Sequence, residues 1–331
     1  MTTLRGFATW ETFLGGITVV LAVYAACAIP GFTTSFNISQ AIAGMSEKAL
    51  IVLPMVLLIV AREIDLSVAS TLALSSVIFG LLLQHGMPLS VAVPLTLIAG
   101  ALCGAFNGLL VTRLGLPSLV ATLGTLAMFR GVAYMLIGAG SVNTLPSALV
   151  NFGNDTLSDT LPVLSSLPWT IVPFLIAAPI FGVVLHHGVL GRRVFAIGGN
   201  PETARYSGIN MTRIRMQLFI ASGAMCALAG IVFTARLSNA RADNALGFEL
   251  DVITIVLLGG VSVFGGSGRL LGAFWALVLV ALIRNVLGLS LIGGDAQGTV
   301  IGSLLIVSLL ASKSAKAIFA TLPGLGRMRK V

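Results

Sequence analysis

The chain has 331 residues, of which 57% are hydrophobic and only 9% are charged. A soluble domain carries roughly 25% charged residues, so this composition excludes a water-exposed globule and predicts an all-α polytopic membrane protein. The net charge of +8 does not indicate a nucleic-acid partner, because basic residues in short loops beside apolar segments set membrane topology. We therefore expect membrane lipid, and no nucleic acid, around the chain.

Ten apolar segments are expected to be transmembrane helices, since crossing the hydrocarbon core takes roughly 20 mainly apolar residues. In chain order they run 13–30, 41–61, 66–83, 88–111, 118–137, 168–185, 214–235, 249–264, 270–289 and 295–311. The second contains Glu47 and Lys48, and the eighth is short and contains Gly259 and Gly260. We interpret 1–331 as a single transmembrane domain that ends in a basic tail, 312–331.

The loops between these segments indicate an orientation. With the N-terminus inside, cytoplasmic segments hold 14 of the 19 Lys and Arg residues, whereas external segments hold only Arg236 and Arg241. Such a bias predicts an even number of spans with both termini in the cytoplasm. The localisation that follows is a bacterial inner membrane, crossed many times.

Two patterns within the spans concern helix packing. Gly100, Gly104 and Gly108 recur every four residues, which predicts a flat stripe where another helix approaches closely. Asn107 in the fourth span and Asn285 in the ninth have similar surroundings, although the two spans run in opposite directions. This similarity suggests the hypothesis of an inverted repeat that relates spans 2–5 to spans 7–10.

Motifs for catalysis are absent from the sequence. It contains no G-x-x-x-x-G-K-[ST] phosphate loop, no H-E-x-x-H zinc motif and no G-x-S-x-G nucleophile motif. We therefore expect no enzyme activity, metal or cofactor in this chain. Transport remains as the function.

The inner loop 191–213 contains a short predicted helix with residues typical of helix caps at both ends. We expect Gly198 and Gly199 to form a tight turn, Asn200 to cap the helix and Pro201 to occupy its first position. Gly208 then ends the helix in the left-handed conformation. A helix of about seven residues is unstable alone in water, so this one indicates a docked partner protein.

Three ordered motifs in the chain are similar to those of ribose-type sugar ABC-importer permeases. The first is the inner loop itself, from Arg192 to Ile209. Residues 63–70, Glu-Ile-Asp-Leu-Ser-Val-Ala-Ser, resemble that family's Gly-Ile-Asp-Leu-Ser-Val-Gly-Ser signature, and the third motif lies within 247–268. Glu63, where Gly is typical, makes the chain most similar to the rhamnose-importer permeases, although autoinducer-2 and other sugar permeases share the motifs. The polar signature residues are Glu63, Asp65, Ser67, Glu249 and Asp251.

This resemblance implies the following machine. Two permease subunits, as a homodimer or heterodimer, form the channel, two ATPase subunits bind ATP and dock on the permeases from the cytoplasm, and a periplasmic binding protein delivers the sugar. The residues implied to couple the chain to the ATPase are Gly198, Gly199, Asn200, Pro201, Glu202, Thr203, Ala204, Arg205, Ser207 and Gly208.

Polar groups within the spans leave alternatives open. The charges of Glu47, Lys48, Arg130 and Arg284 are either gates and pathway walls or interhelical salt bridges. Plausible walls of a sugar pathway are Asn107, Thr122, Thr125 and Asn285, and hydrogen bonding between helices explains them equally well. The rival function is an ion-coupled secondary sugar transporter, against which most acidic residues lie near the ends of spans.

Overall fold

The computed structural model describes residues 10–157, 166–294, 296–304 and 306. Within them the chain forms helices joined by short loops, with two isolated β-bridges. The helices are α1 (Trp10–Ala28), α2 (Ser35–Val60), α3 (Val68–Gln84), α4 (Leu89–Thr112), α5 (Ser118–Ile137), α6 (Ser147–Asn154), η4 (Trp169–Ile171), α7 (Val172–His186), α8 (Val189–Gly199), α9 (Pro201–Tyr206), α10 (Met211–Leu237), α11 (Phe248–Leu258) and α12 (Leu270–Leu289).

Seven stretches of this fold are long and apolar enough to cross a membrane: α1, α2, α4, α5, η4 with α7, α10 and α12. Apolar α3 is slightly shorter, at 17 residues. The tenth expected span, 295–311, and the basic tail 312–331 lie partly or wholly outside the described residues; 296–304 are helical. The composition therefore predicted the all-helical class, and the exact number of spans stays a prediction.

The expected span 249–264 is wrong in its second half. Helix α11 ends at Leu258, and its 11 residues extend only about 16 Å of the roughly 30 Å hydrocarbon core. Gly260 has a φ of 85°, which ends the helix, and Gly259 lies too close to Gly272 and Ala273 of α12 to carry a side chain. The rest of the segment is a glycine-rich loop that runs to Arg269.

Two long helices form the centre of the molecule. Nearly every side chain of α2 from Met45 to Val60 is buried, and α10 is largely buried as well. Helices α3, α4 and α6 pack on α10, whereas α7, α11 and α12 pack on α2. The outer helices α1, α4, α5 and α7 expose apolar side chains over most of their length, as a lipid-facing surface requires.

The expected glycine stripe is confirmed as a packing surface. Gly100, Gly104 and Gly108 face α10, where a Cβ on Gly104 would overlap the carbonyl oxygen of Phe219. Gly223 of α10 is equally tight against Gly100. This contact brings the backbones of α4 and α10 together. The two helices are held by the close packing of small residues instead of by large buried side chains.

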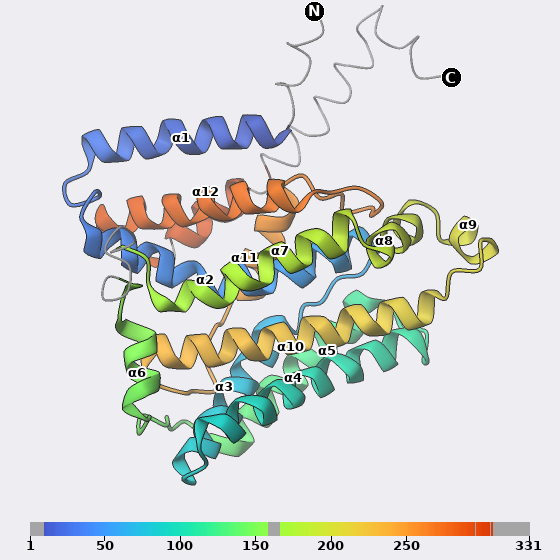
Figure 1. Ribbon diagram of the computed structural model, residues 1–331, viewed down its shortest axis with the longest axis horizontal. Helices are drawn as coiled ribbons and strands as arrows, with labels where there is room; N and C mark the ends of the chain where they lie inside the picture. The colour runs from blue at the N-terminus through green and yellow to red at the C-terminus, as the bar shows by residue number, and fades with distance from the viewer. Residues whose placement is uncertain (1–9, 158–165, 295, 305, 307–331) are drawn as a thin grey trace, which may run out of the picture.

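Figure 1 shows the long helices side by side, with short elements at the two ends of the bundle. Helix α6 lies across one end, where a bridge between Val142 and Ala240 joins two loops. Helices α8 and α9 lie at the other end, and α9 projects beyond the long helices.

Candidate functional site

The short helix predicted in the inner loop is present as α9, with the expected caps. The side-chain oxygen of Asn200 accepts hydrogen bonds from the backbone N–H groups of Glu202, at 3.0 Å, and Thr203, at 3.1 Å. Pro201 occupies the first helical position, and Gly208 ends the turn with a φ of 76°. Local capping alone therefore defines this helix at both ends.

Helix α9 is attached to the bundle by one face. Ala204 is buried and contacts the main apolar core, which Ile209 also joins. Glu202, Arg205 and Tyr206 point outward, and Tyr206 is 91% exposed. A six-residue helix that exposes an aromatic and two charged side chains is suited to receive another protein.

Gly198 and Gly199 do not form the expected tight turn, because they are the last two residues of α8. Asn200, with φ of −152°, makes the turn instead. Gly198 is required for close packing, since a Cβ there would overlap the carbonyl oxygen of Val60 at the end of α2. Gly199 has open space around it, so the structure gives it no such constraint.

Three chain segments meet where α8 ends. Arg62, directly after α2, donates from Nε to the carbonyl oxygen of Gly198 at 2.7 Å and from Nη2 to that of Gly199 at 2.9 Å. The backbone N–H of Gly266, in the loop after α11, donates to the carbonyl oxygen of Val60 at 2.9 Å. We call these five residues the inner junction. Sequence reasoning counted Arg62 only as a topological charge and missed this contact.

Glu63, the departure from the family signature, has a charged partner. Its Oε1 lies 2.8 Å from Nε of Arg215, near the start of α10. Burial raises the pKa of Glu63, and the Arg215 guanidinium opposes that shift. The ion pair links the segment after α2 to the helix that follows α9.

Asp65 and Ser67 lie in a buried polar network. Asp65 accepts hydrogen bonds from the N–H of Ser67 at 3.0 Å, from its hydroxyl at 2.7 Å and from the hydroxyl of Ser222 on α10 at 3.0 Å. Asn107 donates from Nδ2 to the Ser67 hydroxyl at 2.7 Å. The network joins α4 and α10 to the connection between α2 and α3.

Of the two expected pathway threonines, Thr122 holds that same connection. The Thr122 hydroxyl accepts from the backbone N–H of Leu66 at 3.1 Å and lies 2.8 Å from the carbonyl oxygen of Ser118, to which it donates. Thr125 is buried and donates to the carbonyl of Thr122. The structure thus brings Asn107 and Thr122 together around residues 64–67, whereas the bond of Thr125 stays within α5.

The charges within the spans form ion pairs near the middle of α2. Nζ of Lys48 lies 2.6 Å from Asp251, and Nη2 of Arg284 lies 2.7 Å from both oxygens of the same carboxylate. Nε of Arg236 lies 2.6 Å from Glu47. These pairs connect α2, α10, α11 and α12. Of the two alternatives that the sequence left open, pathway gates and interhelical salt bridges, the structure shows salt bridges.

Arg130 bonds to backbone atoms instead of an acidic side chain. Its Nη1 donates to the carbonyl oxygens of Ala242 at 2.7 Å and Asn244 at 2.6 Å, in the loop that follows α10. Glu249, the remaining signature residue, is half-buried in the first turn of α11. Arg130 therefore fixes the loop that leads into α11.

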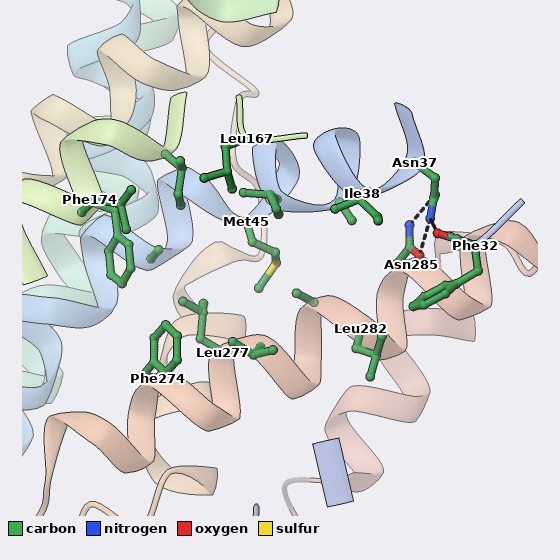
Figure 2. Close-up of a pocket in the computed structure, with 17 residues that line it drawn as sticks. Phe32, Asn37, Ile38, Met45, Leu167, Phe174, Phe274, Leu277, Leu282 and Asn285 are labelled. Atoms are coloured by element: carbon green, nitrogen blue, oxygen red, sulfur yellow. Dashed lines mark hydrogen bonds between the residues drawn. The ribbon is translucent and has the colours of Figure 1, made fainter. Parts of the chain in front are cut away.

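Asn285 lies apart from the other expected pathway residues. It lines a cavity of about 420 Å³ between α2, α7 and α12, whose other walls are apolar side chains such as Met45, Phe174 and Phe274. Figure 2 shows Asn285 and Asn37 facing each other at one end of it, where their amides exchange hydrogen bonds of 2.8 and 3.0 Å. Volumes of this size hold small organic molecules.

Comparison with known proteins identifies the chain as a permease component. A family model described as branched-chain amino acid transport system, permease component, matches residues 37–309. The chain belongs to this permease family. Membership places it in the bacterial inner membrane as a multi-span permease component of an importer.

Several curated relatives are autoinducer 2 import system permease proteins LsrD. Those of Yersinia enterocolitica serotype O:8 and Yersinia pseudotuberculosis serotype O:3 are both 36% identical to this chain over 266 residues. The first alignment covers 78% of each chain, and the second covers 78% of this chain and 77% of the relative. No solved structure matches the chain.

Proposed function

We propose that this permease passes a monosaccharide-sized solute inward, using ATP that a separate ATPase subunit binds and hydrolyses. Helix α9 is the observation that carries the proposal. It is capped at both ends, attached by one face, and exposed on the other, where Glu202, Arg205 and Tyr206 stand free for a partner. Among the coupling residues 198–205, 207 and 208, the exposed Glu202, Thr203, Arg205 and Ser207 form the surface on which the ATPase docks, and the others cap the helix or pack it on the bundle. The chain itself needs no cofactor.

The relatives narrow the class of solute. Their names assign autoinducer 2 to them, and at 36% identity this chain shares a scaffold suited to a small polar solute of that size. A periplasmic binding protein selects the solute and delivers it to the outer face. The rhamnose-type subtype stays a prediction. The relatives, which are autoinducer 2 permeases, favour the autoinducer 2 subtype instead.

The cavity in Figure 2 is our choice for part of the solute pathway. Asn37 and Asn285 place two amide groups at one end of an otherwise apolar chamber, which suits weak binding of a passing polyol. Asn107 and Thr122 bond around residues 64–67, and Thr125 bonds to Thr122 within α5, so we assign all three to positioning that connection rather than to the pathway.

The same proposal includes the arrangement of the spans. Ten spans with both termini in the cytoplasm place α9 on the inner face. An inverted repeat accounts for the packing order, in which α4 and α3 lie on α10 as α12 and α11 lie on α2. A second permease, identical or closely related, completes the channel.

Transport in proteoliposomes tests the proposal. With the ATPase and the binding protein present, labelled sugar should enter only with ATP, and a double substitution, Glu202→Ala with Arg205→Ala, should lower uptake per ATP hydrolysed at least about tenfold. Arg113→Ala serves as the control, since it removes an exposed arginine beyond the end of α4 and outside the coupling residues. Uptake driven by a sodium or proton gradient with the ATPase inactive would instead establish the ion-coupled transporter.

A further inference from the structure

Arg62 adopts a backbone conformation that is unfavourable for its side chain. Its φ is 65°, in the left-handed region where glycine is favoured and other residues are uncommon. An arginine kept at such a position needs a compensating interaction. The two hydrogen bonds from its guanidinium to the carbonyl oxygens of Gly198 and Gly199 supply one.

These bonds are made to the C-terminal end of α8. The last carbonyl groups of a helix lack partners within the helix and carry its partial negative charge. The cationic guanidinium of Arg62 satisfies two of them with its planar fork, an arrangement that an ammonium group does not reproduce. The end of α8 is thereby fixed to the residue that follows α2.

The covalent connection from α8 to α9 places this contact directly beside α9. Gly199 is followed by Asn200, the cap of α9, so no flexible linker separates α9 from the carbonyl groups that Arg62 holds. On the other side, Arg62 is two residues beyond Val60, the end of α2, which is buried from Met45 onward. Gly198 packs on Val60 without room for a Cβ, which keeps the two helix ends in register.

We propose that Arg62 is the positioning residue through which displacement of α9 moves α2. This proposal rests on the proposed function, since α9 must receive force from the ATPase. A second route from α9 runs along the chain into α10, where the Glu63–Arg215 ion pair returns to the same segment. The inner junction differs because it reaches the end of α2 directly, through hydrogen bonds and the packing of Gly198 on Val60.

Arg62→Gly tests the proposal, because glycine suits the φ of 65° yet removes both hydrogen bonds. In proteoliposomes with the ATPase, ATP hydrolysis should continue while sugar uptake per ATP falls about tenfold. The melting temperature of the permease should stay within a few degrees of wild type, since relief of backbone strain offsets the lost bonds. Arg62→Lys, which keeps the charge but not the fork, should recover only part of the uptake.

Matched variants separate the junction from general effects. Gly198→Ala, which forces Val60 and α8 apart, should reproduce the loss of coupling. Arg113→Ala removes an exposed arginine beyond the end of α4 and should transport normally. Normal uptake per ATP in Arg62→Gly would overturn the role of Arg62, while absence of ATP-driven uptake in the wild type would overturn the proposed function instead.

Discussion

Asp251 is the acceptor on which two cations from different helices depend. Lys48 comes from α2 and Arg284 from α12, and the side chain of Lys48 is only 5% exposed. A carboxylate in this position neutralises groups that have little access to water. Its removal leaves two positive charges facing each other near the middle of α2.

Asp251→Asn is therefore expected to destabilise the permease by about 3 kcal/mol, measured as a fall in its unfolding midpoint in detergent. Asp243→Asn is the matched control, since Asp243 also pairs with an arginine, Arg241, but in an exposed loop. The Arg241 guanidinium lowers the pKa of Asp243, yet water screens such pairs, so this variant should melt like wild type. Equal midpoints for both variants would contradict the structural role of Asp251.

Sequence alone shows which residues in the spans are charged but not which ones meet. Lys48 and Asp251 are 203 positions apart, and no local pattern relates them. The caps of α9 are different, because Asn200, Pro201 and Gly208 act within one turn of their own positions. Local chemistry was thus predictable, whereas Arg62, whose contacts lie about 136 positions away, was not recognised.

At the scale of elements, the contact between α4 and α10 depends on the absence of side chains. Gly104→Ala should destabilise the protein by about 1–3 kcal/mol, because the new methyl group overlaps the backbone of Phe219. Gly124→Ala on α5 should be neutral or stabilising by up to about 1 kcal/mol, since its Cβ meets nothing within 4 Å. Unfolding in detergent compares the two; a larger loss for Gly124→Ala would contradict the packing.

The elements also show that apolar runs in the sequence do not always correspond to whole transmembrane helices. Every expected span up to 270–289 corresponds to a helix, but 249–264 was taken as one span although its glycines end α11 at Leu258. Hydropathy does not distinguish a helix from an uncharged glycine-rich loop, since both contain mainly apolar and small residues. The hydrogen bond from the Gly266 N–H to the carbonyl oxygen of Val60 holds this loop against the end of α2.

At the scale of the molecule, α2 is held near its middle and at its C-terminal end by different chemistry. Glu47 and Lys48 fix it through ion pairs to α10, α11 and α12, and the inner junction fixes it to α8. Between these points its side chains are almost all buried. A helix held in this way moves as a rigid body, which is the kind of element that switches between two arrangements.

This mechanism requires the two ends of α10 to face opposite sides of the membrane. Tyr206 precedes α10 and is 91% exposed, whereas Leu246 follows it and is 67% exposed. In a background in which Cys27, Cys103 and Cys226 are replaced by Ser, an impermeant maleimide should label Leu246→Cys in right-side-out vesicles and Tyr206→Cys only in inverted ones. Labelling of Tyr206→Cys from outside would place α9 beyond reach of an ATPase and reverse the proposed direction of coupling.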